Sequence, residues 1–230
     1  MGVIKLRVME NFELIIFDCD GVLVDSERVA NEVFAKILKE ECGFSLSLED
    51  MFETFVGRAA GQCMEIIEDM LGAKPPPGLE VRYRKDINKA LKESVTAVNG
   101  IEHALAEISI PYCVASSGSY EKMQTTLGKT KLLELFEGKL YSASDVARGK
   151  PFPDIYLHAA ESMGCSSPRR CLVIEDSPLG VEGAVAADMV VFGYAELVKE
   201  EKLIKAGAHH TFSDMSNLAH EIATYEHAAL

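Results

Sequence analysis

The sequence predicts an α/β protein in which a parallel β-sheet carries helices on both faces and a helical segment is inserted after the first strand. Three observations lead to this prediction. Short apolar runs alternate along the chain with amphipathic stretches of helix length, as they do in parallel sheets. Most of these runs are followed by Ser, Gly, Asp or Pro. Between Glu27 and Ala97 few strand signals occur and the hydrophobic periodicity is helical.

The first predicted strand is an unbroken apolar run, Leu14–Phe17, which is typical of a strand buried on both faces of a sheet. Four similar runs follow: Tyr112–Ala115, Leu140–Tyr141, Cys171–Ile174 and Met189–Phe192. Amphipathic segments lie between them and are expected to be helices: Gly100–Ile108, Lys122–Leu127, Pro153–Met163 and Leu179–Ala187.

The inserted segment shows two amphipathic helical faces separated by a Pro- and Gly-rich breaker at residues 72–78. The first face contains Val29, Val33, Phe34, Ile37 and Leu38, and the second contains Met64, Ile66, Ile67, Met70 and Leu71. We therefore expect a core domain made of residues 1–26 and 98–230, and an all-helical domain, 27–97, that forms a lid over one edge of the sheet. The alternative is that these helices form an ordinary layer of a single domain.

Composition and charge restrict the classes of function. With 36 acidic and 23 basic residues the chain has a formal net charge of −13, which argues against nucleic-acid binding and attachment to anionic membranes. No apolar run has the length of a membrane helix, and residues 1–11 lack the features of a signal peptide. The 6 cysteines show no C-x-x-C spacing, which favours a reducing, cytoplasmic location. Nothing in the sequence indicates a protein partner.

Polar side chains stand at the ends of three predicted strands. Asp18 and Asp20 follow the first strand, Ser116 follows the second, and Asp176 follows the run that begins at Cys171. In parallel sheets ligands bind beyond the carboxyl ends of the strands, so these residues are expected to form one site. Two carboxylates beside a buried strand are costly unless a cation or a reacting group lies close to them.

Four motifs occur in order along the chain, and together they resemble those of the haloacid dehalogenase superfamily, in particular its phosphatase-like members with a helical cap. The motifs are Asp18-Cys19-Asp20-Gly21-Val22, Val114-Ala115-Ser116-Ser117-Gly118, Gly149-Lys150-Pro151-Phe152-Pro153-Asp154 and Ile174-Glu175-Asp176-Ser177. The resemblance covers essentially the whole chain. It implies a Rossmann-like core with the 27–97 segment as the cap.

The resemblance also implies separate roles for the two aspartates of the first motif. Asp18 would be the nucleophile that attacks phosphorus and becomes an aspartyl phosphate, which divides one difficult displacement into two easier ones. Asp20 would protonate the leaving alkoxide and then deprotonate the attacking water. The alternative is that the pair only caps or turns the chain.

A magnesium site is implied next to these aspartates. By resemblance Asp176, Asp18 and the main-chain carbonyl of Asp20 would bind Mg²⁺, which prefers hard oxygen ligands. Glu175 either ligates the metal or acts indirectly. A structural alternative for Glu175 and Asp176 is helix capping, because a Ser-Pro pair, a good helix start, follows them.

The remaining implied contacts are with the phosphoryl group. Ser116 would donate a hydrogen bond to it, helped by the backbone amides of Ser117 and Gly118, and Lys150 would neutralise charge on the nucleophile and the phosphoryl group. The alternatives are a turn that ends the strand for the serines and a solvated loop position for the lysine.

Substrate recognition is assigned to the cap. Arg58, in a Gly-Arg step, is a candidate for a distal carboxylate or phosphate, with an ordinary surface arginine as the alternative. Arg84 and Lys85 are weaker candidates, and His209-His210 is interpreted as a pair in a loop.

The leading hypothesis is a Mg²⁺-dependent phosphomonoester hydrolase for a small phosphorylated metabolite. The second half of the chain looks closest to phosphatases that act on sugar acids such as 6-phosphogluconate. A sugar-phosphate mutase of the beta-phosphoglucomutase type shares all four motifs, but such mutases usually carry a His where this chain has Ala30. A non-catalytic phosphometabolite-binding module is the third possibility, although none of the four charged motif residues is lost.

Overall fold

The computed structural model describes residues 12–56, 58 and 60–228, which contain one sheet of 6 strands that all run parallel. The strands are β1 Leu14–Phe17, β2 Tyr112–Ser116, β3 Leu140–Ser142, β4 Cys171–Glu175, β5 Val190–Tyr194 and β6 His210–Phe212. The helices are α1 Ser26–Cys42, α2 Leu48–Phe55, α3 Ala60–Leu71, α4 Leu79–Ser94, α5 Ile101–Glu107, α6 Tyr120–Lys129, α7 Asp154–Ser162, α8 Pro178–Ala186, α9 Glu200–Ala206 and α10 Leu218–Ala228. The predicted α/β class is confirmed.

Strand β1 separates two apolar layers because its side chains alternate between the faces of the sheet. Ile15 and Phe17 pack with the buried residues of α5, α6 and α10. Leu14 and Ile16 pack with those of α7, α8 and α9. All four are buried, as the unbroken apolar run predicts for a strand covered on both sides.

The order of the strands, β3-β2-β1-β4-β5-β6, places a switch point at β1. The chain leaves β1 toward β2 and β3 on one side and later returns to β4 on the other. Phe17 pairs with Val114 of β2 and with Ile174 of β4, so the three strands end at the same edge of the sheet, β4 one residue and β2 two residues beyond β1. Such a point is where open α/β sheets bind ligands.

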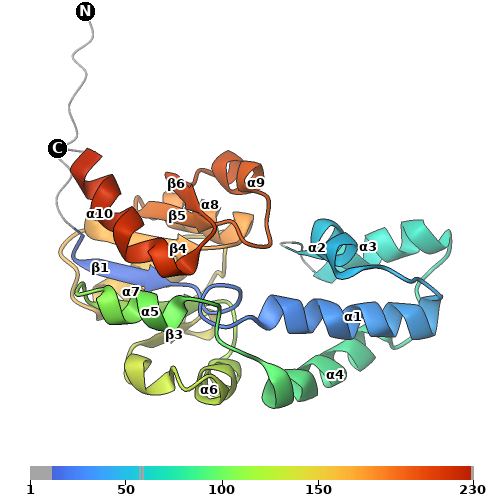
Figure 1. The fold of residues 1–230 in the computed structure, drawn as a ribbon. Coiled ribbons are helices and arrows are strands. Elements are labelled where there is room, and N and C mark those ends of the chain that lie inside the picture. Colours follow the sequence, from blue (N-terminus) through green and yellow to red (C-terminus); the bar gives the residue numbers. More distant parts are fainter. Residues whose placement is uncertain (1–11, 57, 59, 229–230) are drawn as a thin grey trace, which may run out of the picture.

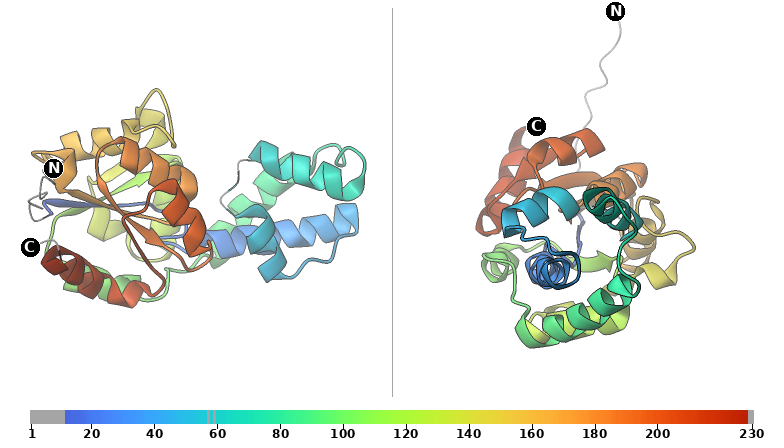
Figure 2. Two further views of the ribbon diagram at one scale, coloured as in Figure 1. Left: turned by 90° about the horizontal axis from the view of Figure 1, so that it is seen from above. Right: turned by 90° about the vertical axis from the view of Figure 1, so that its right-hand side faces the viewer.

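Helices α1 to α4 lie together beyond one end of the sheet (Figures 1 and 2). They surround an apolar cluster of their own, which contains Phe34, Ile37, Leu38, Met51, Phe55, Ile67 and Leu79. Two chain segments join this helical group to the sheet, one before α1 and one after α4, and they lie side by side. The amide of Asp25 donates to the carbonyl of Thr96, and the amide of Val98 donates to the carbonyl of Leu23. The division into a core and a cap at residues 27 and 97 stays a prediction, and the separate cluster supports it.

Two details differ from the expectations. The His209-His210 pair is not a plain loop, because His210 begins β6, which is the edge strand beside β5. The run there is too short and too polar to stand out as a strand in the sequence. Met70 of the second predicted face is 40% exposed, whereas Ile67 of the same helix is fully buried. None of the helices in the described ranges is long and apolar enough to span a membrane.

Candidate active site

The carboxyl ends of β1, β2 and β4 bring three of the four motifs together, and the loop after β3 adds the third motif. The amide of Asp18 donates to the carbonyl of Ile174 at 3.0 Å, which extends the pairing of β1 with β4 by one residue. Asp18 therefore begins the loop at the point where the sheet ends. Asp176 follows directly on the last residue of β4.

Lys150 lies at the centre of this cluster. Its Nζ donates to Asp18 Oδ1 and to Glu175 Oε1, each at 2.5 Å, and its side chain is only 5% exposed. Burial opposes the charge of this lysine, but the carboxylates of Asp18 and Glu175 outweigh it and raise the pKa of Lys150 well above its usual value. Lys150 is therefore an ammonium held against the predicted nucleophile.

Glu175 is fully buried and accepts four hydrogen bonds. Its Oε1 accepts from Lys150 and from the hydroxyl of Tyr156 (3.0 Å), and its Oε2 accepts from the amide (2.8 Å) and the hydroxyl (2.9 Å) of Ser177. A Cβ at Gly180 would lie 1.8 Å from Oε1, so only glycine leaves room for this carboxylate. Direct ligation of a metal by Glu175 would require one of these hydrogen bonds to be given up.

Asp18 and Asp176 are two further buried carboxylates at the same place. Desolvation, and then the charges of Glu175 and Asp20 against the opposing ammonium of Lys150, raise the pKa of Asp18 to about 7. Desolvation and the neighbouring charges of Glu175 and Asp18 also raise the pKa of Asp176. These three buried carboxylates thus share the buried ammonium of Lys150, and the excess negative charge fits a divalent cation with hard oxygen ligands.

The turn at Gly21 brings the first motif against Asp176. Gly21 has φ 79°, and a Cβ built on it would lie 2.1 Å from Asp176 Oδ2. Glycine is required there both by the backbone conformation and by the close approach. In the described ranges no group of three or more His, Cys, Asp and Glu side chains forms a metal site. The predicted ligand set differs in kind, because it combines two carboxylates with a main-chain carbonyl.

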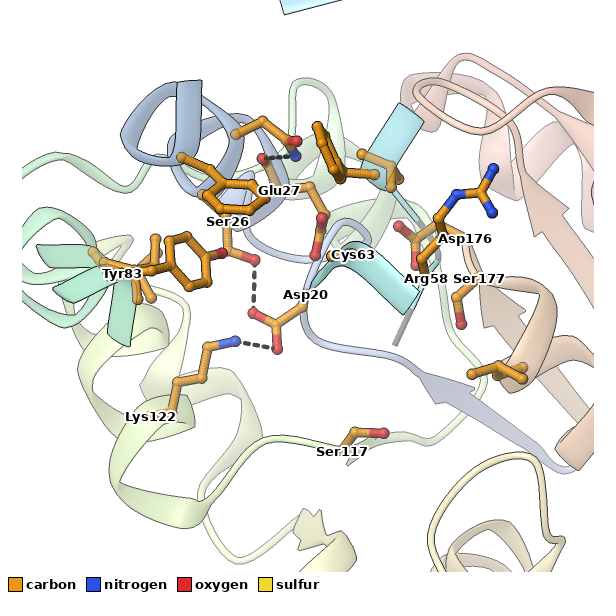
Figure 3. Close-up of a pocket in the computed structure, with 18 of the residues that line it drawn as sticks. Asp20, Ser26, Glu27, Arg58, Cys63, Tyr83, Ser117, Lys122, Asp176 and Ser177 are labelled. Carbon is orange, nitrogen blue, oxygen red and sulfur yellow. Dashed lines mark hydrogen bonds and ion pairs between the residues drawn. The ribbon is translucent and has the colours of Figure 1, made fainter. Parts of the chain in front are cut away.

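Asp20 is held by two side chains that the sequence analysis did not single out. Its Oδ1 accepts from the hydroxyl of Ser26 at 2.6 Å, and its Oδ2 accepts from Lys122 Nζ at 2.8 Å (Figure 3). Ser26 begins α1 and Lys122 lies in the first turn of α6. A lysine in an amphipathic helix carries no pattern that distinguishes it from a solvated residue, so this contact was not predictable.

The second motif forms the floor of the site. Ser116 is buried, and its Oγ accepts from the amide of Gly118 at 3.0 Å. The carbonyl of Gly118 accepts from Ser142 in turn. The amide of Gly118 is thus engaged within its own loop, while Ser116 and Ser117 both line the cavity above the site.

This cavity, of about 650 Å³, lies between the sheet edge and the helical group. It is lined by Asp18, Ser116, Lys150 and Asp176 from the sheet side. Residues of α1, α4 and the segment around α3 form the opposite wall (Figure 3). Of the three basic residues considered for substrate recognition, Arg58 and Arg84 line the cavity and Lys85 does not.

The two cavity arginines make different contacts. Arg58 Nε donates to the carbonyl of Thr54, and Arg58 lies on the side opposite Tyr83 and Lys122 (Figure 3). Arg84 is paired with Glu80 of the same helix at 2.7 Å. Arg58 is therefore the better placed of the two for a substrate.

Glu27 is a further cavity residue that the sequence analysis missed. Its carboxylate points into the space above Asp20 (Figure 3). Desolvation, and then the charge of Asp20, raise the pKa of Glu27 to about 7. In the sequence Glu27 has only the pattern of an acidic residue in the first turn of a helix, which is common.

Comparison with known proteins places these features in context. The model of the haloacid dehalogenase-like hydrolases matches residues 12–188. The 6-phosphogluconate phosphatase of Escherichia coli K12 is 32% identical over 185 residues, which cover 80% of this chain and 83% of that protein.

Two solved structures are similar over nearly the whole chain. A haloacid dehalogenase-like protein of unknown function from Agrobacterium tumefaciens has 36% identity and a TM-score of 0.88, covering 94% of this chain and 99% of that one. A putative beta-phosphoglucomutase from Thermotoga maritima has 25% identity and a TM-score of 0.73, covering 93% and 99%.

Proposed function

The chain belongs to the haloacid dehalogenase-like hydrolases and is a phosphatase, and from this premise we propose that it hydrolyses small phosphate monoesters with Mg²⁺ through an aspartyl phosphate on Asp18. The observation that carries the proposal is the convergence of Asp18, Lys150 and Asp176 beneath one cavity. A buried carboxylate held by a buried ammonium is suited to attack a phosphoryl group whose charge the same ammonium neutralises.

In the first step Asp18 forms a bond to phosphorus while the bond from phosphorus to the ester oxygen breaks. The leaving oxygen takes a proton from Asp20, which Ser26 and Lys122 hold at the edge of the cavity. In the second step Asp20 removes a proton from a water molecule, whose oxygen attacks phosphorus and releases Asp18 and inorganic phosphate. Ser116 and Lys150 hold the phosphoryl oxygens through both steps.

Asp18, Asp176 and the main-chain carbonyl of Asp20 would hold the metal ion, and Glu175 would join them or support Lys150 from behind. When bound, Mg²⁺ supplies positive charge that lets the carboxylate of Asp18 approach a phosphate dianion. The burial of Asp18 and Asp176 beside the ammonium of Lys150 supports this assignment.

For the substrate we propose a sugar phosphate or a sugar-acid phosphate such as 6-phosphogluconate. The relative from Escherichia coli carries that substrate in its name. A cavity of about 650 Å³ has room for an extended six-carbon chain, and Arg58 on its wall offers a guanidinium to a carboxylate far from the phosphate. The backbone amide of Ser117 would assist in binding the phosphoryl group.

Hydrolysis is favoured over a mutase by Ala30, which lines the cavity. Its methyl group cannot exchange a proton with a sugar hydroxyl, as a histidine at this position would. Product analysis separates the two reactions, because a mutase yields an isomeric sugar phosphate and a hydrolase yields free phosphate.

The test is phosphate release from a panel of phosphorylated metabolites with Mg²⁺ and with a chelator. We expect release with Mg²⁺ only, and no release from any ester by folded protein would refute the proposal. The variant Asp18→Asn is expected to bind substrate without turnover. If that variant turned over, Asp18 would not be the nucleophile.

A further inference from the structure

One face of helix α1 forms a wall of the active-site cavity. Ser26, Glu27, Ala30, Asn31 and Phe34 all line it, at spacings that repeat every helical turn. Ser26 is engaged with Asp20, Ala30 and Phe34 are apolar, and the side-chain amide of Asn31 donates to the carbonyl of Glu27. The carboxylate of Glu27 is the remaining charged group on this face.

Glu27 lacks a partner in the part of the chain that the structure describes: neither a hydrogen bond nor an ion pair to its carboxylate is present there. The nearby cation is Lys122, whose Nζ is already bonded to Asp20. The carboxyl groups of Asp20 and Asp25 lie near Glu27 as well, and so does Asp176, whose pKa the charge of Glu27 helps to raise. In the described part of the chain no sealed side-chain oxygen lacks a partner, so the unpaired oxygens of Glu27 are open to the cavity, where donors of a ligand can reach them.

The position of Glu27 indicates which part of a ligand would donate hydrogen bonds to its carboxylate. It lies near Asp20, the residue that protonates the ester oxygen, and between Tyr83 on one side and Asp176 on the other (Figure 3). Because Glu27 lies near Asp20, the carbon atoms that follow an ester oxygen held at Asp20 would lie beside this wall. Arg58 lies on the far side of Glu27 from Tyr83 (Figure 3).

We propose that Glu27 is a specificity residue that accepts a hydrogen bond from a hydroxyl group within two or three carbons of the phosphate ester and rejects a carboxylate at that distance. This inference rests on the proposed phosphatase activity. It assigns the enzyme to esters that are polyhydroxylated next to the phosphate. It excludes short phosphorylated acids, whereas a long sugar acid keeps its carboxylate away from Glu27.

Glycerol 3-phosphate and 3-phosphoglycerate test whether Glu27 rejects a carboxylate. The two esters differ only two carbons from the ester carbon, where the first has a CH₂OH group and the second has a carboxylate. We expect the wild type to prefer glycerol 3-phosphate in kcat/KM by at least roughly 10-fold. Glu27→Gln keeps the size and one acceptor oxygen of the side chain but removes its charge. It should reduce the ratio of kcat/KM for glycerol 3-phosphate to kcat/KM for 3-phosphoglycerate by roughly 10-fold. Glu32→Gln, an exposed position on the same helix, is the matched control and should leave the ratio unchanged.

The hydrogen bond from a substrate hydroxyl to Glu27 is tested with 3-hydroxypropyl phosphate, which lacks only the middle hydroxyl of glycerol 3-phosphate. A hydrogen bond to a charged group predicts a preference of roughly 10- to 100-fold for glycerol 3-phosphate in the wild type. Glu27→Ala should abolish this preference by lowering kcat/KM for the hydroxylated ester alone.

The outcomes distinguish this inference from the proposed function. If no ester is hydrolysed by folded protein with Mg²⁺, the proposed function itself fails. If esters are hydrolysed but Glu27→Gln and Glu27→Ala leave both ratios unchanged, the specificity role is overturned. Equal losses for all three substrates would also overturn it, because they would place Glu27 among the groups that support the reaction and not among those that select the substrate.

Discussion

Replacing Gly21 by alanine tests how closely the first motif and Asp176 depend on each other. The new Cβ would lie 2.1 Å from Asp176 Oδ2, so the carboxylate or the turn must move by about 1.5 Å to reach an ordinary contact. The backbone also has φ 79° there, a conformation that costs an alanine about 1–2 kcal/mol. Overpacking against Asp176 adds about 1–3 kcal/mol. We therefore expect the free energy of unfolding to fall by about 2–5 kcal/mol.

Gly164→Ala is the matched control. Gly164 has φ 73° and follows α7, which packs on the same sheet, but an added Cβ would meet nothing within 4 Å. In this variant the free energy of unfolding should fall only by the cost of the backbone conformation, about 1–2 kcal/mol, and the activity should be unchanged. Urea unfolding followed by circular dichroism measures both variants, and the difference between them isolates the clash with Asp176.

Activity gives the second measurement. A shift of more than about 1 Å in Asp176, the proposed metal ligand, is expected to lower kcat/KM at least roughly 100-fold in Gly21→Ala. The reasoning is refuted if Gly21→Ala unfolds at the same urea concentration as Gly164→Ala and retains wild-type kcat/KM.

Three further predictions concern the side chains around the site. Tyr156→Phe removes the hydroxyl that contacts Glu175 Oε1, and we expect a loss of about 1–3 kcal/mol in the free energy of unfolding together with a lower kcat at unchanged KM. Lys122→Ala removes the ion pair to Asp20, and kcat should fall roughly 10-fold, with little change in KM. Burial and the charge of Asp20 raise the pKa of Glu27 from 4.5 to about 7 in the folded protein. The contribution of this carboxyl group to the free energy of unfolding is therefore fully present below pH 4.5 and is lost as the pH rises through 7. In chelator, Glu27→Gln should therefore match the wild type near pH 4.5 and exceed it by about 1–3 kcal/mol at pH 8.

Each of these predictions has a clear contrary result. Lys129→Ala, at an exposed position on the same helix as Lys122, should leave kcat unchanged, and an equal loss in both variants would remove the special role of Lys122. A rise in KM with constant kcat in Tyr156→Phe would show that this tyrosine acts on substrate binding and not on the reaction through Glu175. A stability difference for Glu27→Gln that does not vary with pH would show that the Glu27 carboxyl titrates near its ordinary value.

The sequence was sufficient for the residues whose position follows from strand ends. Asp18, Ser116 and Asp176 come directly after or at the end of apolar runs, and parallel strands bring such positions to one edge. The sixth strand was missed because β6 is short and polar, and its pairing with β5 depends on contacts that no local pattern records.

The side chains that hold the site together were not predictable in the same way. Lys122, Tyr156 and Glu27 lie in helices, where their types fit a solvated or core-facing role equally well. Their contacts with Asp20, Glu175 and the cavity arise only when helices distant in sequence pack against the sheet edge.

By itself the sequence determined the α/β class, the four motifs and hence the chemistry expected at Asp18, Asp20, Lys150 and Asp176, because hydrophobic periodicity and residue type are local properties. Only the tertiary structure decided that Glu175 is saturated by four hydrogen bonds and that Asp20 is paired with Lys122. It alone also placed the carboxylate of Glu27 on the cavity wall. Hydrogen bonds, burial and pKa depend on which groups face one another in three dimensions, and a linear order of residues does not specify that.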